Sequence, residues 1–180
     1  FLNVYIEIFR GTPMIVQSMV IFYGSAQAFN ISLDRTWAAI FIVSINTGAY
    51  MSEIVRGGIL AVDPGQFEAA TALGMTHGQT MRKVVLPQVV RNILPATGNE
   101  FVINIKDTSV LNVISVVELY FTGNTVATQN YQYFPTFTII AVIYFVLTFT
   151  ITRILRYIER RLDSDTYTTG ANQMQVKEVK

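Results

Sequence analysis

Two stripes of polar and ionisable residues interrupt long apolar stretches of the sequence, where such groups are costly and by default functional. Within each stripe the residues are spaced at i, i+4 and i+7, so on a helix they share one face. The first stripe consists of Asn46, Tyr50 and Glu53, and the second of Glu100, Asn104 and Asp107. We expect both stripes to face protein or water rather than lipid.

The second stripe carries the stronger chemical signal. Glu100 and Asp107 are two carboxylates with the single base Lys106 nearby in the sequence, which leaves net negative charge for a cation. An ammonium group would balance that charge, while Asn104, Lys106 and backbone groups could meet a carboxylate. The adjoining hydroxyl groups, which we place in the same substrate pathway, belong to Thr108 and Ser109.

Helix packing is the alternative for part of this set, because Asn, Ser and Thr also pair between spans. For Asn46 and Ser109 the sequence leaves packing and a pathway role open. Glu53 and Arg56 lie near one end of their apolar stretch. We favour an ion pair that holds helices together there, with a gate as the alternative.

Gaps in the charge distribution indicate the elements that must position these stripes. No Asp, Glu, Lys or Arg occurs in residues 11–33, 36–52 or 119–152, and a helix needs about 20 mostly apolar residues to cross a bilayer. We therefore predict an all-α membrane protein, a helical bundle of about four spans. The spans are Thr12–Phe29, Asp34–Ile59, Ile93–Tyr120 and Phe134–Tyr157, with turn residues at 30–33 and a polar, aromatic connection at 122–133.

Basic residues indicate the orientation of the spans. They alternate onto one side, with only Arg35 on the other, and the positive-inside rule makes the basic side cytoplasmic. The loop 61–92 and the C-terminus then face the cytoplasm, and the polar tail 163–180 is expected to be disordered. The basic residues concerned are Arg10, Arg56, Arg82, Lys83, Arg91, Arg153, Arg156, Arg160 and Arg161.

The loop 61–92, called the helical loop below, contains two predicted short helices. Asp63 followed by Pro64 indicates an N-cap and a first helical residue, and Gly74 is suited to ending that helix. Thr76 begins a second helix with a capping-box spacing, and Pro87 is expected to end it. An ordinary surface connection is the alternative, but the small residues around Glu68 would let another protein approach the backbone closely.

The helical loop also carries a recognisable motif: E-A-A, three residues, G, nine residues, I or V, one residue, L-P. The matching residues are Glu68, Ala69, Ala70, Gly74, Val84, Leu86 and Pro87. This motif, with the flanking stretches "YIEIFRGTPMIVQ", "NTGAYMSEIVRGGI", "LPATGNEFVINIKDTSVLNVISVVEL" and "RYIERRL", resembles the permease subunits of bacterial ABC importers in the polar amino acid uptake family. The resemblance runs from about Val4 to Leu162. That family has one more span before "YIEIFRGTP", so we expect an N-terminal span to be missing here.

This resemblance implies that residues 1–162 form a type I importer domain whose helical loop docks into a separate ATPase. Glu68, Ala69, Ala70, Gly74, Leu86 and Pro87 would then be the ATPase-coupling residues. ATP and magnesium would be bound by that partner, and this chain would need no cofactor. The other expected partners are a second permease subunit, identical or related, an extracytoplasmic solute-binding protein, an amino acid and the lipid of the bacterial inner membrane.

Several other classes are disfavoured by composition and motifs. The formal net charge of +1 argues against nucleic-acid binding. The sequence has no phosphate-binding GK[ST] loop, no G-x-S-x-G, no H-E-x-x-H and no Cys, so we expect no enzyme and no ATP hydrolysis by this chain. His77 stands alone without a second ligand at metal spacing, so no metal is expected. The alternative functions are a permease for another small solute and a non-ABC channel.

Overall fold

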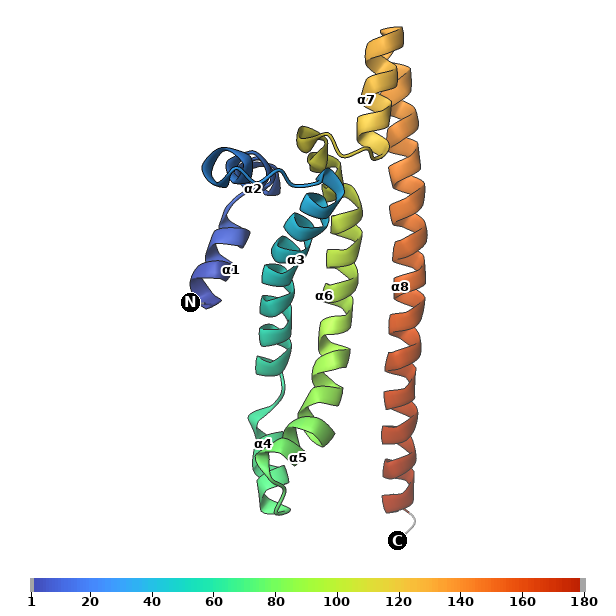
Figure 1. Cartoon of the computed structure of the whole chain (residues 1–180). Coiled ribbons are helices and arrows are strands. Elements are labelled where there is room, and N and C mark those ends of the chain that lie inside the picture. Colours follow the sequence, from blue (N-terminus) through green and yellow to red (C-terminus); the bar gives the residue numbers. More distant parts are fainter. Residues whose placement is uncertain (1, 179–180) are drawn as a thin grey trace. The chain divides into compact units, whose positions relative to one another are not determined.

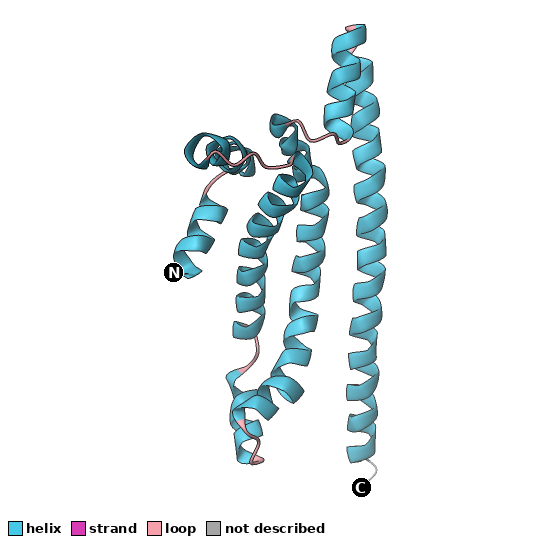
Figure 2. Cartoon of the chain, viewed as in Figure 1, coloured by secondary structure: helices cyan, strands magenta, loops and turns pink. Residues whose placement is uncertain are grey.

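The computed structural model describes the backbone of residues 2–178 and the side chains of residues 2–161. The backbone is mostly helical, without a strand among the described residues, which confirms the predicted all-α class (Figure 2). The helices are α1 (Leu2–Gly11), α2 (Met14–Phe29), α3 (Arg35–Leu60), α4 (Pro64–Ala72), α5 (His77–Thr80), α6 (Leu86–Asp107), α7 (Leu119–Asn130) and α8 (Tyr133–Glu178), with a π-helix η1 (Met81–Val85) and a 3₁₀-helix η2 (Thr108–Ile114) (Figure 1). The predicted disordered tail at 163–180 lies outside the residues whose side chains are described and stays a prediction.

The chain forms two compact units, described separately below. The first comprises Phe1–Glu53 and Glu100–Thr150, and the second comprises Ile54–Asn99 and Ile151–Lys180. The helical loop lies wholly within the second unit, and both polar stripes lie wholly within the first.

Within the described part of the chain, two helices are long and apolar enough to cross a membrane: α3 and the part of α8 from Tyr133 to Arg161. They confirm the second and fourth predicted spans. A third candidate is a pair, His77–Ile114 and Leu119–Asn130, bent by 55°. The first predicted span is shorter than expected, because α1 and α2 are separate and α2 has only 16 residues.

The predicted span Ile93–Tyr120 is not a single helix. The α-helix ends at Asp107, a 3₁₀ segment follows, and Ser115 adopts a left-handed φ of 60°. A new helix then begins because the Glu118 carboxylate accepts hydrogen bonds from the amides of Tyr120 (2.7 Å) and Phe121 (2.6 Å). The expected connection at 122–133 is therefore mostly the helix α7.

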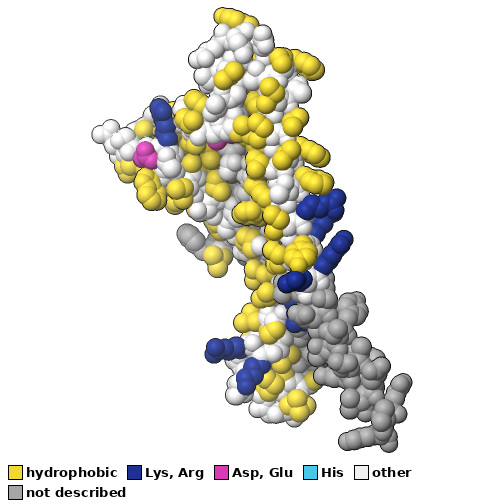
Figure 3. All heavy atoms as spheres, turned by 90° about the vertical axis from the view of Figure 1, so that its right-hand side faces the viewer, with side chains coloured by type: hydrophobic (Ala, Val, Ile, Leu, Met, Phe, Trp, Pro, Cys, Tyr) yellow, Lys and Arg dark blue, Asp and Glu magenta, His cyan; other side chains and the backbone are white. Residues whose placement is uncertain are grey.

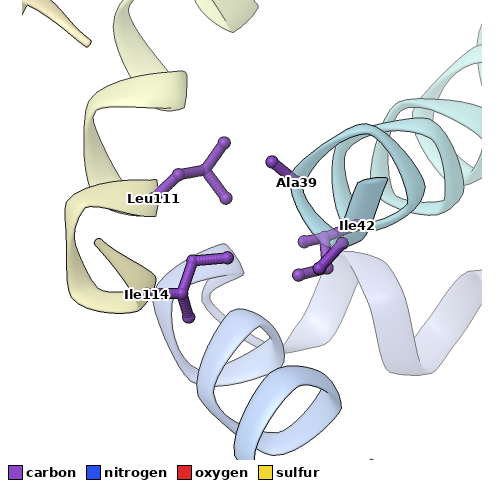
Figure 4. Close-up of a cluster of buried hydrophobic side chains, with 5 residues drawn as sticks. Ala39, Ile42, Leu111 and Ile114 are labelled. Carbon is purple, nitrogen blue, oxygen red and sulfur yellow. The ribbon is translucent and has the colours of Figure 1, made fainter. Parts of the chain in front are cut away.

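The core of the first unit explains the break after Asp107. Leu111 and Ile114 of η2 point toward Ala39 and Ile42 of α3, and all four are buried (Figure 4). Met14, Ile21 and Phe22 of α2 pack against the same cluster. The tighter turn of a 3₁₀-helix places apolar side chains differently from an α-helix, and here they complete this core.

Close approach also joins α7 to α8 in the first unit. A Cβ added at Gly123 would lie 2.0 Å from Ile140 Cδ1, so any larger residue at this crossing would displace the Ile140 side chain. Along the same helix, α8 exposes a series of large apolar side chains, as expected of a helix that contacts lipid (Figure 3). The exposed residues are Tyr133, Phe134, Ile139, Val142, Ile143, Phe145, Val146, Leu147 and Phe149.

Candidate coupling surface and polar site

The helical loop begins its two short helices where the sequence predicts. The Asp63 carboxylate accepts a hydrogen bond from the Gly65 amide at 2.7 Å, and Pro64 is the first residue of α4. Thr76 and Gln79 form both hydrogen bonds of a capping box at the start of α5. These caps satisfy amides that the first turn of a helix leaves without intrahelical partners.

Gly74 ends α4 in a left-handed turn, with φ at +73°. The Gly74 amide donates to the Thr71 carbonyl (2.9 Å) and the Met75 amide to the Ala70 carbonyl (3.0 Å), which is the hydrogen-bond pattern of a Schellman motif. A Cβ added at Gly74 would have no heavy atom within 4 Å. Glycine is therefore required by the backbone, and the surface beside it is open.

The second short helix does not end at Pro87, contrary to the sequence-based prediction. The helix α5 continues through the π-helix Met81–Val85 directly into α6, which begins at Leu86. Pro87 is the second residue of α6 and lies within this continuous helical run. The wider turn of the π-helix therefore connects α5 to α6 where the sequence predicts a non-helical connection.

The motif residues divide into exposed and buried ones. Glu68, Ala69, Gly74, Leu86 and Pro87 are exposed. Ala70 is only 3% exposed and belongs to the interior of the helical loop. Leu73 is 81% exposed and was missed by the sequence analysis, although an apolar residue directly before the glycine of the motif was a usable signal.

A small apolar core fixes the helical loop to the helices beside it. Val62, Val85 and Val89 are buried together. The partly buried residues packed against them are Ile59 of α3, Phe67 of α4, Met81 of η1 and Ile93 of α6. Because this core draws on all four elements, α4 is held against the start of α6 rather than hanging from a flexible linker (Figure 1).

In the first unit, Asn46 has structural partners. Its Nδ2 donates to Gln17 Oε1 at 3.0 Å and to the Phe9 carbonyl at 3.3 Å. Gln17 Nε2 lies 2.9 Å from the Phe9 carbonyl and 2.8 Å from the Thr12 carbonyl. The two buried amides thus donate hydrogen bonds to backbone carbonyls that lack helical partners at the break between α1 and α2. Such carbonyls need a donor from the protein where no water can reach them. The sequence gives no signal for Gln17, because its role depends on its hydrogen-bond partners and not on its residue type.

Tyr50 and Glu53, on the polar face of α3, both contact Arg10 of α1. A guanidinium nitrogen of Arg10 lies 3.3 Å from a Glu53 carboxylate oxygen, and its guanidinium carbon lies 5.6 Å from the centre of the Tyr50 ring. The sequence predicts a pair between Glu53 and Arg56, whereas Arg10 carries no sequence signal for this contact. A pair between Glu53 and Arg56 stays a prediction.

The second stripe is connected to α3 through Thr47. The Thr47 hydroxyl donates to Asn104 Oδ1 at 3.1 Å, and Asn104 Nδ2 donates to the Glu100 carbonyl at 3.1 Å, with Glu100 Oε1 at 3.5 Å. This chain of hydrogen bonds orients the Asn104 amide. The partly buried Glu100 carboxylate makes only one long contact with that amide. Thr47 was missed because threonine is unremarkable within an apolar span.

The remaining residues of the second stripe lie where α6 changes into η2. Lys106 and Asp107 are exposed. The Thr108 hydroxyl donates to the Ile105 carbonyl at 3.1 Å, and the Ser109 carbonyl accepts from Asn112 Nδ2 at 2.6 Å. Among the side chains described, no group of three His, Cys, Asp or Glu could hold a metal ion.

Apolar helices of spanning length, polar side chains bonded between helices, and an exposed, packed helical loop are the features of a membrane transport subunit. The chain belongs to the family of binding-protein-dependent transport system inner membrane components, whose pattern matches residues 1–164. The predicted resemblance to ABC importer permeases is thereby confirmed, and the chain is a multi-pass membrane protein.

Relatives and solved structures agree with this family. The chain is 41% identical over 160 residues to the glutamine transport system permease protein GlnP of Escherichia coli (strain K12), covering 88% of this chain and 73% of that protein. It is 38% identical over 161 residues to the arginine transport system permease protein ArtQ of Bacillus subtilis (strain 168), covering 89% and 74%. A crystal structure of an amino acid ABC transporter with histidines matches with a TM-score of 0.84 and 45% identity, covering 88% of this chain and 74% of that one.

A more distant structure shares the fold. The methionine ABC transporter MetNI in an inward-facing conformation matches with a TM-score of 0.75 at 20% identity, covering 89% of this chain and 73% of that one. At this identity the likeness concerns the arrangement of helices and not the substrate.

Proposed function

We propose that this permease subunit moves a polar amino acid into the cytoplasm, driven by ATP that a separate ATPase subunit hydrolyses. The family supports the importer class, and relatives named for glutamine, arginine and cystine support the substrate class. The alternative of a non-ABC channel has no support. Other small solutes are not favoured, because these relatives are amino acid permeases.

The helical loop is the observation that carries this proposal. Its exposed face combines the Glu68 carboxylate, the 81%-exposed Leu73 and the open surface at Gly74. An exposed large apolar side chain among small residues is typical of a protein contact rather than of a simple connection. A partner bound to this face moves the start of α6 together with the helical loop, because the apolar core beneath the loop is packed.

The partners and the orientation follow from this role. The ATPase would bind ATP and magnesium on the cytoplasmic side, and this chain would need no cofactor. A second permease subunit would complete the pathway, and a solute-binding protein would dock on the outer face near residues 30–33 and 122–133. The membrane would be the bacterial inner membrane, with the C-terminus in the cytoplasm.

For the substrate pathway we propose Glu100 and Asp107 as partners of a cation on the amino acid. Glu100 is partly buried, and Asn104 beside it is held in place by Thr47. Lys106, Thr108 and Ser109 remain candidate contacts for the substrate carboxylate. Asn46 and Tyr50 have structural partners, so we assign them support of the pathway rather than substrate contact.

The coupling role is tested by charge reversal on the exposed face. In vesicles that contain the complete transporter, Glu68→Lys is expected to reduce both ATPase association and ATP-driven amino acid uptake, while the protein still inserts. Glu7→Lys reverses an exposed glutamate outside the helical loop and serves as the matched control. Normal association and uptake for Glu68→Lys would refute the docking role.

The substrate assignment needs a separate test. Uptake of labelled glutamine is measured in competition with unlabelled arginine, histidine and glutamate, for the wild type and for Glu100→Gln and Asp107→Asn. The expected result is a higher KM for both variants, because a lost charge–charge contact weakens binding. Unchanged affinity in both variants would remove the carboxylates from the pathway.

A further inference from the structure

Two adjacent glycines near the end of α3 differ completely in their surroundings. A Cβ added at Gly57 would have no heavy atom within 4 Å. A Cβ added at Gly58 would lie 2.2 Å from Ile93 Cγ2 and 3.4 Å from Val89 Cγ1. The backbone of α3 therefore touches the side chains of α6 at Gly58 and leaves open space at Gly57.

The contact at Gly58 cannot be relieved cheaply. Cγ2 of Ile93 is attached directly to Cβ, and a β-branched side chain in a helix has essentially one χ1 rotamer. Rotating Cγ2 out of the way would force Ile93 off its preferred conformation, so the helices themselves would have to separate. Ile93 also packs against the core that Val62, Val85 and Val89 form beneath the helical loop.

We propose that Gly58 is a positioning residue for energy coupling: the Gly58–Ile93 contact locks α3 to α6 so that movement of the helical loop reaches both helices together. This inference rests on the proposed function, since it assumes an ATPase that pulls on the helical loop. Val62 and Phe67 tie the loop to α6 on one side, and Gly58 ties α6 to α3 on the other. The loop and the two helix ends therefore move as one body.

Helix packing alone is the competing explanation, because glycine commonly permits close helix approach. The two explanations predict different consequences when the Gly58–Ile93 contact is lost. Loss of packing lowers the amount of folded protein and its thermal stability. Loss of transmission lowers the amount of amino acid transported for each ATP hydrolysed, in protein that has folded and bound its ATPase.

The test compares Gly58→Ala with the matched control Gly57→Ala in vesicles that hold the complete transporter, namely permease, ATPase and solute-binding protein. Uptake of a labelled mixture of glutamine, arginine and histidine and hydrolysis of ATP are measured on the same preparation. Gly58→Ala is expected to lower uptake per ATP by about fivefold or more, the usual scale of a lost coupling between sites. Gly57→Ala is expected to match the wild type.

Removing the obstacle should restore coupling. Ile93→Ala deletes Cγ2 and leaves only Cβ, which lies 3.7 Å from the added methyl group, an ordinary contact distance. The double variant Gly58→Ala/Ile93→Ala is therefore expected to recover the uptake per ATP of Ile93→Ala alone. A Gly58→Ala protein that is less stable but transports normally for each ATP, or a double variant without recovery, would overturn the proposal.

A second pair of variants keeps the proposal testable if Gly58→Ala does not assemble. Val85→Ala opens a cavity in the core beneath the helical loop and is expected to lower uptake per ATP, whereas Val90→Ala on the exposed side of α6 is not. Equal values for the two variants would overturn the proposal. A wild-type transporter without ATP-dependent uptake of any labelled amino acid would instead refute the proposed function itself.

Discussion

Replacing Gln17 and Asn46 singly and together by leucine measures what these two buried amides do. Gln17 is 6% exposed and Asn46 is 8% exposed. Gln17→Leu removes the donor to the Thr12 carbonyl and the better of the two acceptors of Asn46 Nδ2, and leaves a single contact of 3.3 Å between Asn46 Nδ2 and the Phe9 carbonyl. An unsatisfied buried polar group costs about 1–3 kcal/mol, so we expect a loss of about 3 kcal/mol in the free energy of unfolding.

Asn46→Leu should cost less. The Phe9 carbonyl keeps its bond from Gln17, and only Gln17 Oε1 loses a donor, which predicts a loss of about 1–2 kcal/mol. Both single variants remove the same Asn46–Gln17 bond, so the double variant should lose less than the sum of the two by about 1 kcal/mol.

The assay is denaturation of the purified protein in detergent, combined with uptake measurements in vesicles. Gln27→Leu, an exposed glutamine of the same helix, is the control and should change the free energy of unfolding by less than about 0.5 kcal/mol. Additive single losses would refute the shared hydrogen bond. An Asn46→Leu protein of normal stability but with raised KM would place Asn46 in the substrate pathway after all.

Three further substitutions test other contacts, each read from the free energy of unfolding. Glu118→Ala removes the cap of α7 and the acceptor of the Tyr144 hydroxyl (3.0 Å), with an expected loss of about 2 kcal/mol; an unchanged midpoint would contradict the cap. Arg10→Ala removes the ion pair with Glu53, and because both side chains are partly exposed the loss should stay near 1 kcal/mol. Gly74→Ala should lose about 1 kcal/mol to the left-handed turn alone, and a loss above about 3 kcal/mol would show a steric contact that the open surface excludes.

The sequence predicted the parts of the fold that depend on local signals. The helices α3 and α8 follow from uninterrupted apolar runs of membrane length, and the two caps of the helical loop follow from Asp63 and Thr76. Gly74 was assigned correctly for the same reason, because a left-handed turn at the end of a helix has a strong residue preference.

The parts that depend on tertiary contacts were not predictable in this way. Val110, Leu111, Val113 and Ile114 read equally well as α-helix, and the 3₁₀ turn is fixed by packing against α3. The sequence predicts a helix end at Pro87, because the π-helix before it has no simple sequence signature. Thr47, Gln17 and Arg10 were overlooked because their importance lies in partners 57, 29 and 43 positions away, and a single sequence does not reveal such pairs.

The π-helix sets a mechanical condition on the proposed function. No non-helical residue separates His77 from Ile114, so the helix that starts in the helical loop continues to the polar stripe at Glu100 and Asn104. A π segment is the part of such a helix that can tighten or loosen its turn at least cost. It would absorb a pull on the loop unless its side chains were fixed. Val85 within that segment is completely buried, and Met81 packs on the same core, so the segment is held and the pull is passed on to α6.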